Sequence, residues 1–336
     1  MDPVTQGVFG SLWAQSAARS SRLRQAAIAG IAGGLAPDLD VLIRSREDSL
    51  LVIEYHRHFT HSLAFIPIGA LAVALVLWPL FRRRAEFAWL YLWAFLGYAS
   101  HGLLDAFTSY GTYLWWPFSD QRVAWNWISV IDPLFTVPLI GLLGAALIWR
   151  RRLLVGLAWC WAVGYLALAG VQNHRAESVL LDWADDHGLK VERHVAKPSF
   201  ANLVLWRGMV DDGQTFHLVA IRNPPFGRQR LYPGGSVERF LVDGFDPETR
   251  LGSDLARFDH FSSNWLFRYP PYDSNGEWFV GDFRYAIDPA SQRPLWGVVF
   301  DPKRTELPAE YTTPRRVTDE EREAFFQRLK GKQAGS

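Results

Sequence analysis

The sequence predicts an α-helical multipass membrane domain followed by a soluble α+β domain. Long uncharged apolar runs occur only in the first half of the 336-residue chain. That half has 13 arginines and no lysine, whereas every lysine of the chain lies after residue 174. Alternating apolar patterns with turn signals, which are typical of strands, are confined to the second half. We therefore expect a membrane-embedded domain over residues 1–174 and a soluble domain over residues 175–336.

Four apolar runs are expected to cross the membrane as helices. The first has 20 residues without a charge, and an α-helix needs ~20 residues to cross ~30 Å of hydrocarbon. Four such helices could not easily be buried in so small a soluble domain. The runs cover residues 62–81, 87–104, 134–149 and 153–171.

Two shorter apolar stretches precede these runs, at residues 8–18 and 26–35. At ~1.5 Å per residue each is well short of 30 Å. They predict a short N-terminal helical hairpin that spans half of the membrane, or two tilted helices. The N-terminus lacks a basic leader, so no cleavable signal peptide is expected.

Arginine-rich turns predict the orientation of the helices. Three arginines occur in each of residues 18–24, 82–84 and 150–152. If the helices alternate in direction, these turns share one face, which the positive-inside rule makes cytoplasmic. The chain after Val171 then lies on the other side. We expect a bacterial inner-membrane protein with a periplasmic or extracellular C-terminal domain.

The second half has the pattern of a soluble α+β domain. A helix is expected over residues 176–188, and a final helix from Thr318, where Glu321 completes a capping box. No known catalytic motif occurs in this half. The net charge of +1 gives no reason to expect a nucleic-acid partner, and the single Cys160 excludes an intrachain disulfide. Strands are expected over residues 201–210, 215–222, 277–287 and 295–300.

Histidines and aspartates gather on the face opposite the arginine turns. His101 and Asp105 are four residues apart, so both lie on one side of a helix. Imidazole and carboxylate together suit zinc, with manganese or iron as alternatives. The pair could instead form a buried hydrogen bond between two helices. Nearby candidates for the same site are Asp38, Asp40, His56 and His61, whereas His58 could be solvated.

In order along the chain, the segments MDPVTQGVFG, PDLD, HRHFTHSL, SHGLLDAFTSYGT, WPFSD and IDPLF resemble the membrane-bound metal-dependent hydrolases of the bacterial YdjM family. The resemblance covers about residues 1–150. It implies that the metal is held by Asp38, Asp40, His56, His61, His101 and Asp105. Two positions depart from the family pattern: Gln6 stands where a histidine is usual, and Asn126 where an aspartate is expected.

These features predict a membrane-bound metal-dependent hydrolase that acts on a phosphoester or lipid-linked substrate at the outer face. Asp38 or Asp40 could serve as a ligand or as the catalytic general base. Asp132 could orient a ligating histidine or stabilise the start of a helix. Membrane lipids are the expected partners, and the tryptophans of residues 110–127 either anchor the interface or line a lipid entrance.

Two other classes of protein remain open. The first is a non-enzymatic membrane protein with a structural metal and a partner-binding C-terminal domain. Gln6 favours this class, because a missing ligand would impair catalysis. The second is a transporter with a His/Asp relay inside the membrane.

Overall fold

The computed structural model describes residues 1–314 and 317–332. The chain divides into two compact units. Unit 1 comprises residues 1–42, 55–171 and 200–202, and unit 2 comprises residues 43–54, 172–199 and 203 onward. The boundary expected after residue 174 falls inside a single helix that runs from one unit into the other.

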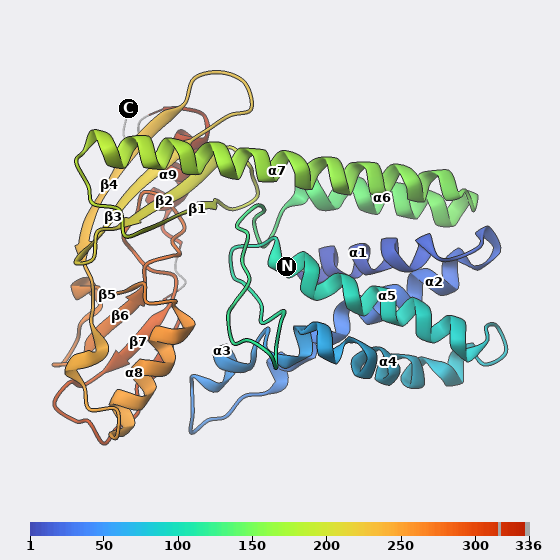
Figure 1. Cartoon of the computed structure of the whole chain (residues 1–336), viewed down its shortest axis with the longest axis horizontal. Coiled ribbons are helices and arrows are strands. Elements are labelled where there is room, and N and C mark those ends of the chain that lie inside the picture. The colour runs from blue at the N-terminus through green and yellow to red at the C-terminus, as the bar shows by residue number, and fades with distance from the viewer. Residues whose placement is uncertain (315–316, 333–336) are drawn as a thin grey trace. The chain divides into compact units, whose positions relative to one another are not determined.

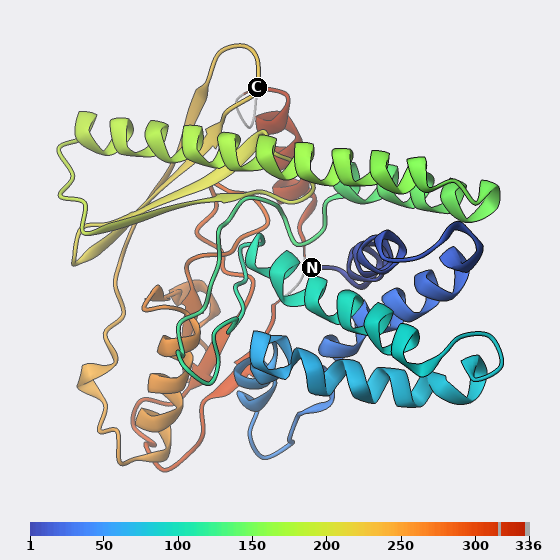
Figure 2. The same cartoon turned by 45° about the vertical axis from the view of Figure 1, so that its right-hand side comes forward.

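Unit 1 is helical (Figures 1 and 2). Helix α5 contacts α1, α2 and α4, and α1 also contacts α2 and α6. The expected N-terminal hairpin is formed by α1 and α2. The helices are α1 (Pro3–Ser16), α2 (Leu23–Leu35), α4 (Ile66–Phe81), α5 (Phe87–Ala106), α6 (Pro133–Trp149) and the first part of α7 (Arg152–Asp186).

Glycines allow α1, α2 and α5 to pack closely. A Cβ atom on Gly10 would lie 2.4 Å from the carbonyl oxygen of Gly30, and one on Gly97 would lie 2.3 Å from the same oxygen. Only glycine can occupy such close backbone contacts between helices. The small residues therefore fix how closely α1, α2 and α5 approach one another.

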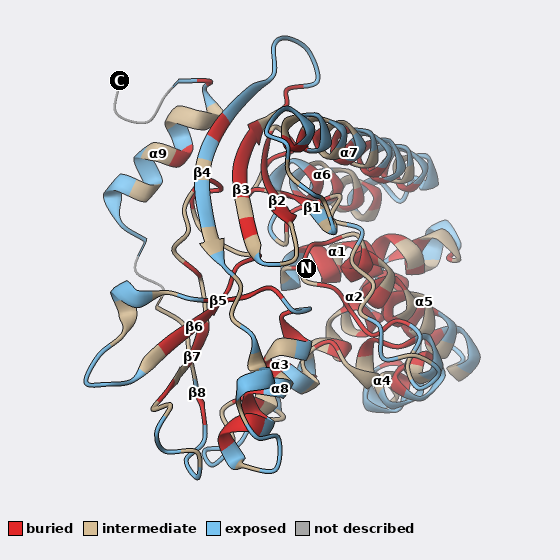
Figure 3. Cartoon of the chain, turned by 60° about the vertical axis from the view of Figure 1, so that its left-hand side comes forward, coloured by how far each residue is buried: buried red, intermediate tan, exposed pale blue. Residues whose placement is uncertain are grey.

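Within the described residues, two helical segments that begin in unit 1 are long and apolar enough to cross a membrane, by length and composition. They are residues Leu63–Phe81 and Arg152–Asp186, while α6 is apolar but shorter. The sequence predicted four long apolar helices, and two helical segments meet the length and hydropathy needed to cross a membrane. Figure 3 shows exposed positions along α4, α6 and α7. Exposed side chains on α4 include Ile68, Leu75, Val76 and Leu80, as expected of a surface that faces lipid.

The three arginine turns lie at one end of unit 1. Arg24, Arg84 and Arg150, one from each turn, line a single pocket of about 360 Å³. The C-terminal ends of α2 and α5 are the ends away from these turns. The basic residues and the His/Asp motifs therefore occupy opposite ends of the same helices, as the sequence predicts.

Unit 2 is rich in β-sheet. It contains two four-stranded antiparallel sheets, with strand orders β1-β2-β3-β4 and β5-β6-β7-β8. The strands are β1 (Arg193–Pro198), β2 (Leu205–Asp211), β3 (Thr215–Arg222), β4 (Arg230–Glu238), β5 (Leu266–Arg268), β6 (Trp278–Asp282), β7 (Gly297–Phe300) and β8 (Glu310–Thr312). Helices α8 (Arg250–Phe261) and α9 (Asp319–Leu329) complete the unit, and the short α3 (Leu51–Tyr55) lies where the two units meet along the chain.

The last part of α7 covers the first sheet of unit 2. Ala176, Leu180 and Ala184 are fully buried and pack with Trp206 and Val219 of the sheet. Their spacing of four residues places them on one side of the helix. The helix expected over residues 176–188 is therefore the continuation of α7.

The other expectations for this half have mixed outcomes. Strand β3 has the predicted bounds, and the capping box at Thr318 is confirmed. The other three predicted strands are shorter than expected. β2 begins at Leu205 rather than at residue 201, β6 ends at Asp282, and β7 begins at Gly297.

Candidate metal centre

Three segments of unit 1 bring the predicted residues together. Asp38 and Asp40 lie in the 3-10 turn Ala36–Leu42 that follows α2. His61 ends the 3-10 turn Phe59–His61, while His101 and Asp105 lie on α5. A Cβ atom on Gly102 would lie 2.3 Å from the backbone oxygen of His61. Glycine at this position thus allows the turn that carries His61 to pack directly against α5.

Four side chains form the central group, and their ligand atoms lie within 4.8 Å of one another. They are Asp38, His61, His101 and Asp105. The two histidine Nε2 atoms are 2.8 Å apart. Oδ1 of Asp38 lies 3.5 Å from Nε2 of His61 and 3.4 Å from Nε2 of His101. Oδ2 of Asp105 lies 3.4 and 3.5 Å from the same two nitrogens.

The backbone fixes which nitrogen of His101 faces the group. Nδ1 of His101 lies 2.6 Å from the carbonyl oxygen of Gly34, which can only accept, so Nδ1 carries the proton. In the neutral ring, Nε2 then presents a lone pair to the other three residues. Nδ1 of His61 lies 3.3 Å from Oδ2 of Asp40, so its Nε2 faces inward in the same way. This is the arrangement that outer hydrogen bonds impose on histidine ligands.

The spacing of the four atoms fits a divalent cation. Two ligands at ~2.0–2.1 Å from one tetrahedral ion lie ~3.3 Å apart, and five of the six separations are between 2.8 and 3.5 Å. Oδ2 of Asp105 is buried and has no hydrogen-bond partner in the described part of the chain. The Arg57 guanidinium pairs with this oxygen, with its Nε 3.2 Å away, and a divalent ion would compensate the remaining buried negative charge of the two carboxylates. The donor set suits zinc, manganese or iron.

Asp38 is the most accessible of the four residues. Its side chain is 21% exposed, whereas those of His61, His101 and Asp105 are fully buried. Burial would raise the pKa of Asp38, but its polar interactions with His101 and His61 outweigh burial and hold the pKa far below its usual range. Asp38 is therefore ionised and marks the side from which a small molecule would approach.

The pKa of His61 reports the negative electrostatic potential that the neighbouring carboxylates create. Burial would lower the pKa of His61, but hydrogen bonds to Asp105, Asp38 and Asp40 raise it to about 10. Without a metal, the ring thus carries a proton at neutral pH. A site that holds a proton against burial also favours a divalent cation in its place.

Asp40 joins His56 and Asp38 in a second, overlapping group. Oδ1 of Asp40 lies 2.9 Å from Nδ1 of His56. Its Oδ2 accepts hydrogen bonds from the backbone N–H of Arg57 and from Oγ1 of Thr60. These bonds hold the 56–61 segment in place. All six predicted residues thus belong to one of the two groups, and Asp38 belongs to both.

Sequence reasoning missed Arg57. Its side chain is 4% exposed, and its Nε lies 3.2 Å from Oδ2 of Asp105. Its guanidinium also donates to Thr108 and lies over the Tyr110 ring. The backbone of Arg57 is left-handed, with φ of 64°, a strained conformation that clusters at functional sites. An arginine between two histidines of a metal motif was the available signal.

Gln6 lies against the central group. It is fully buried, and its Nε2 donates to Oδ1 of Asp105 at 3.0 Å. Its Oε1 has no hydrogen-bond partner among the described residues. The amino group of Met1 donates to the same carboxylate oxygen. The side-chain amide of Gln6 therefore positions the Asp105 carboxylate through its nitrogen, while its oxygen Oε1 makes no hydrogen bond with the described residues.

Three other singled-out residues lie outside both groups. The His58 ring packs against Tyr113 at 4.8 Å between centroids. Asp132 accepts from the backbone at the start of α6 and from the Tyr165 hydroxyl, so it stabilises the helix start. Asn126 donates to the carbonyl of Ala124.

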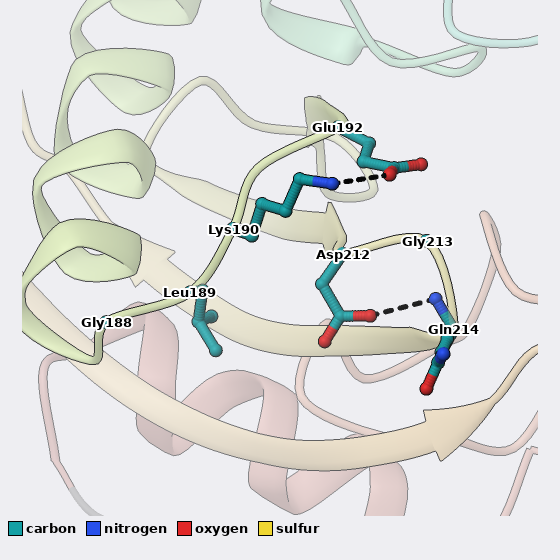
Figure 4. Close-up of a pocket in the computed structure, with 7 residues that line it drawn as sticks. All are labelled: Gly188, Leu189, Lys190, Glu192, Asp212, Gly213 and Gln214. Carbon is teal, nitrogen blue, oxygen red and sulfur yellow. Dashed lines mark hydrogen bonds and ion pairs between the residues drawn. The ribbon is translucent and has the colours of Figure 1, made fainter.

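A pocket in unit 2 provides a contrast (Figure 4). It has a volume of about 510 Å³ and lies between the end of α7 and the β2–β3 turn. Lys190 pairs with Glu192, and Asp212 accepts from the backbone of Gln214 and pairs with His217. Its polar groups are thus matched with one another.

The helices and the central group together define a class of protein. It has apolar helices long enough to cross a membrane and a His/Asp cluster that could hold a metal ion.

Comparison with known proteins identifies the family. Residues 1–176 match the model described as YdjM inner membrane protein, so the chain belongs to this family. It is 29% identical to the uncharacterized protein YfhP of Bacillus subtilis (strain 168), over 77% of this chain and 76% of that protein. It is 33% identical to the inner membrane protein YbcI of Escherichia coli (strain K12), over 37% of this chain and 83% of that protein. No solved structure matches the chain.

Proposed function

We propose that this chain is a metal-dependent hydrolase of the bacterial inner membrane that acts on an anionic phosphoester or lipid-linked substrate at the outer face. One observation carries the proposal: two buried Nε2 atoms 2.8 Å apart face each other between two carboxylates. A divalent cation bound there would supply Lewis acidity and lower the pKa of a water molecule that it holds.

The surrounding residues have separate roles in this proposal. His61, His101 and Asp105 hold the ion, while Gly34 and Asp40 orient the two rings through hydrogen bonds. Asp38, which is partly exposed and ionised, acts as a fourth ligand or accepts the proton of the attacking water. If Asp38 is a ligand, the Asp38→Asn variant should lose metal. If Asp38 is the proton acceptor, the variant should keep its metal and lose activity.

The buried charge of Arg57 supports an anionic substrate. Its Nε lies 3.2 Å from Asp105, so its field adds to that of the ion at the same place. A doubly charged phosphate ester gains more from this field than a neutral carboxylic ester does. The position at the end of the helices opposite the arginine turns supports a site at the outer face.

The proposal is tested by turnover with purified protein. The full chain is loaded with zinc, manganese or iron and assayed on phosphomonoesters, phosphodiesters and lipid-linked phosphates. Hydrolysis should be lost on chelation, restored by the metal, absent from the His61→Ala variant and retained by His58→Ala. The wild-type protein would refute the hydrolase assignment if it held its metal and turned over none of these substrates.

The alternative is a structural metal, and Gln6 in place of the family's usual histidine favours it, because a missing ligand would impair catalysis. In that case metal binding would raise the unfolding temperature of the whole chain while no substrate is hydrolysed. Thermal unfolding of the metal-free and metal-loaded protein, measured beside the activity screen, separates the two functions.

A further inference from the structure

The pocket between the three arginine turns of unit 1 has the features of an anion site. Arg24, Arg84 and Arg150 line it, and none of their guanidinium groups makes an ion pair or hydrogen bond with the residues that the structure describes. Within the described lining there is no acidic side chain to balance them. Three uncompensated cations around about 360 Å³ attract an anion strongly.

Other polar groups of the pocket point to a phosphate-type anion. The hydroxyl-bearing Ser20 and Ser21 belong to the lining, and α2 begins at Leu23, another lining residue. No side chain caps the N-terminus of α2, which directly follows the 3-10 turn Ser20–Arg22, so the positive end of the dipole of this 13-residue helix lies at the same pocket. Arginine forks, hydroxyls and a helix N-terminus together are well suited to phosphate oxygens.

The remaining walls of the pocket are apolar. Ile28, Phe81 and Leu147 lie in it beside the arginines, and α4 ends at Phe81 after its candidate membrane span. A free phosphate ion would gain nothing from these walls. A phospholipid places its phosphate at the arginines and its glycerol and first methylenes against the apolar side chains.

We propose that this pocket binds the phosphate of an anionic phospholipid at the face opposite the metal centre. The inference is independent of the hydrolase assignment, because it uses no residue of the central group. The three arginines thus have a role beyond orientation: they hold one lipid between α2, α4 and α6.

Native mass spectrometry of the full chain in detergent tests the proposal. Phosphatidylglycerol should bind more tightly than phosphatidylcholine, because only the former carries a net negative charge. The Arg84→Gln variant should weaken phosphatidylglycerol binding about fivefold, the change expected for the loss of one arginine beside a lipid phosphate. Arg24→Gln should do the same.

Arg83→Gln is the matched control, because Arg83 belongs to the same turn but not to the pocket lining. It changes the total charge equally and should leave lipid binding unaltered. Equal weakening by Arg83→Gln and Arg84→Gln, or equal affinity for the two lipids, would overturn the proposal. So would millimolar inorganic phosphate that displaces the lipid completely, because the apolar walls would then contribute nothing.

Discussion

Two buried clusters of charge in this chain differ in how their polar atoms are matched. In unit 2, Arg207 donates to the carbonyl oxygens of Phe283, Pro289 and Ser291. Nearby, Arg284 pairs with Asp282 and donates to the carbonyl of Phe261. In the central group of unit 1, by contrast, two histidine Nε2 atoms and oxygen atoms of two carboxylates converge on one point.

The difference separates a structural cluster from a candidate functional site. Both clusters are buried and both contain charges, so burial and charge alone do not distinguish them. Arg207 is paired by backbone acceptors and needs nothing further. The central group contains two imidazoles and two carboxylates that face one point, a set of ligand atoms that a divalent cation would match. Substitution in the central group should therefore lower the metal content, whereas substitution of Arg207 should lower the stability of the protein and leave the metal content unchanged.

The largest expected effect is the loss of metal when a ligand of the central group is removed. His101→Ala should lower metal affinity by more than about 100-fold, beyond the range expected for an outer hydrogen-bond partner. His58→Ala should change it little, because His58 packs against aromatic rings instead. Metal analysis of the purified proteins is the measurement, and full occupancy in His101→Ala would remove that residue from the ligand set.

The structural cluster should respond in stability instead. Arg207→Met keeps much of the side-chain volume but leaves two buried carbonyl oxygens and one partly buried carbonyl oxygen without this donor. We expect a loss of about 3 kcal/mol or more in unfolding free energy, with metal content unchanged. Chemical denaturation followed by tryptophan fluorescence measures the loss. If the variant were as stable as the wild type but free of metal, the contrast between the two clusters would be wrong.

An intermediate effect is expected at Asp40, which orients His61 and also contacts His56. Asp40→Asn preserves the shape but removes the negative charge that fixes the two rings. Loss of such a partner costs about 10- to 100-fold in metal affinity. Calorimetric titration of metal-stripped protein gives the value. A loss as large as that of His101→Ala would identify Asp40 as a direct ligand.

The last expected effect needs no substitution: the metal affinity of the wild-type protein should depend on pH. His61 keeps its proton up to pH about 10 in the metal-free protein, so the metal must displace that proton. Between pH 6 and 8 the apparent affinity should therefore rise by about tenfold per pH unit, with one proton released. Titrations in buffers of different ionisation enthalpy count the proton. An affinity that does not change over this interval would show that metal binding displaces no proton from His61.

The sequence placed His101 and Asp105 together because their spacing is local, whereas Asp38 and His61 were assigned to the same site from their expected face and from the family resemblance. His101 and Asp105 are one helical turn apart, and a helix of any orientation brings them together. Asp38 and His61 are supplied by short turns next to helices. Arg57 was missed because its role depends on a left-handed backbone and on contact with α5, and neither has a local pattern.

Continuity of α7 was missed for a different reason. Hydropathy falls after Val171, and the sequence suggested a new element there. The helix continues because Ala176, Leu180 and Ala184 pack against the first sheet. Tertiary packing of this kind overrides the local signal. Strand β4 escaped prediction as well, since its Pro233, Gly234 and Gly235 are residues that usually interrupt strands.

The central claim is that Asp38, His61, His101 and Asp105 hold one divalent ion. X-ray absorption at the metal edge, combined with elemental analysis of the purified full-length protein, tests it most directly. We predict about one ion per chain, with two imidazole nitrogens at ~2.0–2.1 Å and carboxylate oxygens at ~2.0–2.2 Å if the ion is zinc. Protein that binds no zinc, manganese or iron after reconstitution, or an ion without histidine nitrogens, would contradict the account.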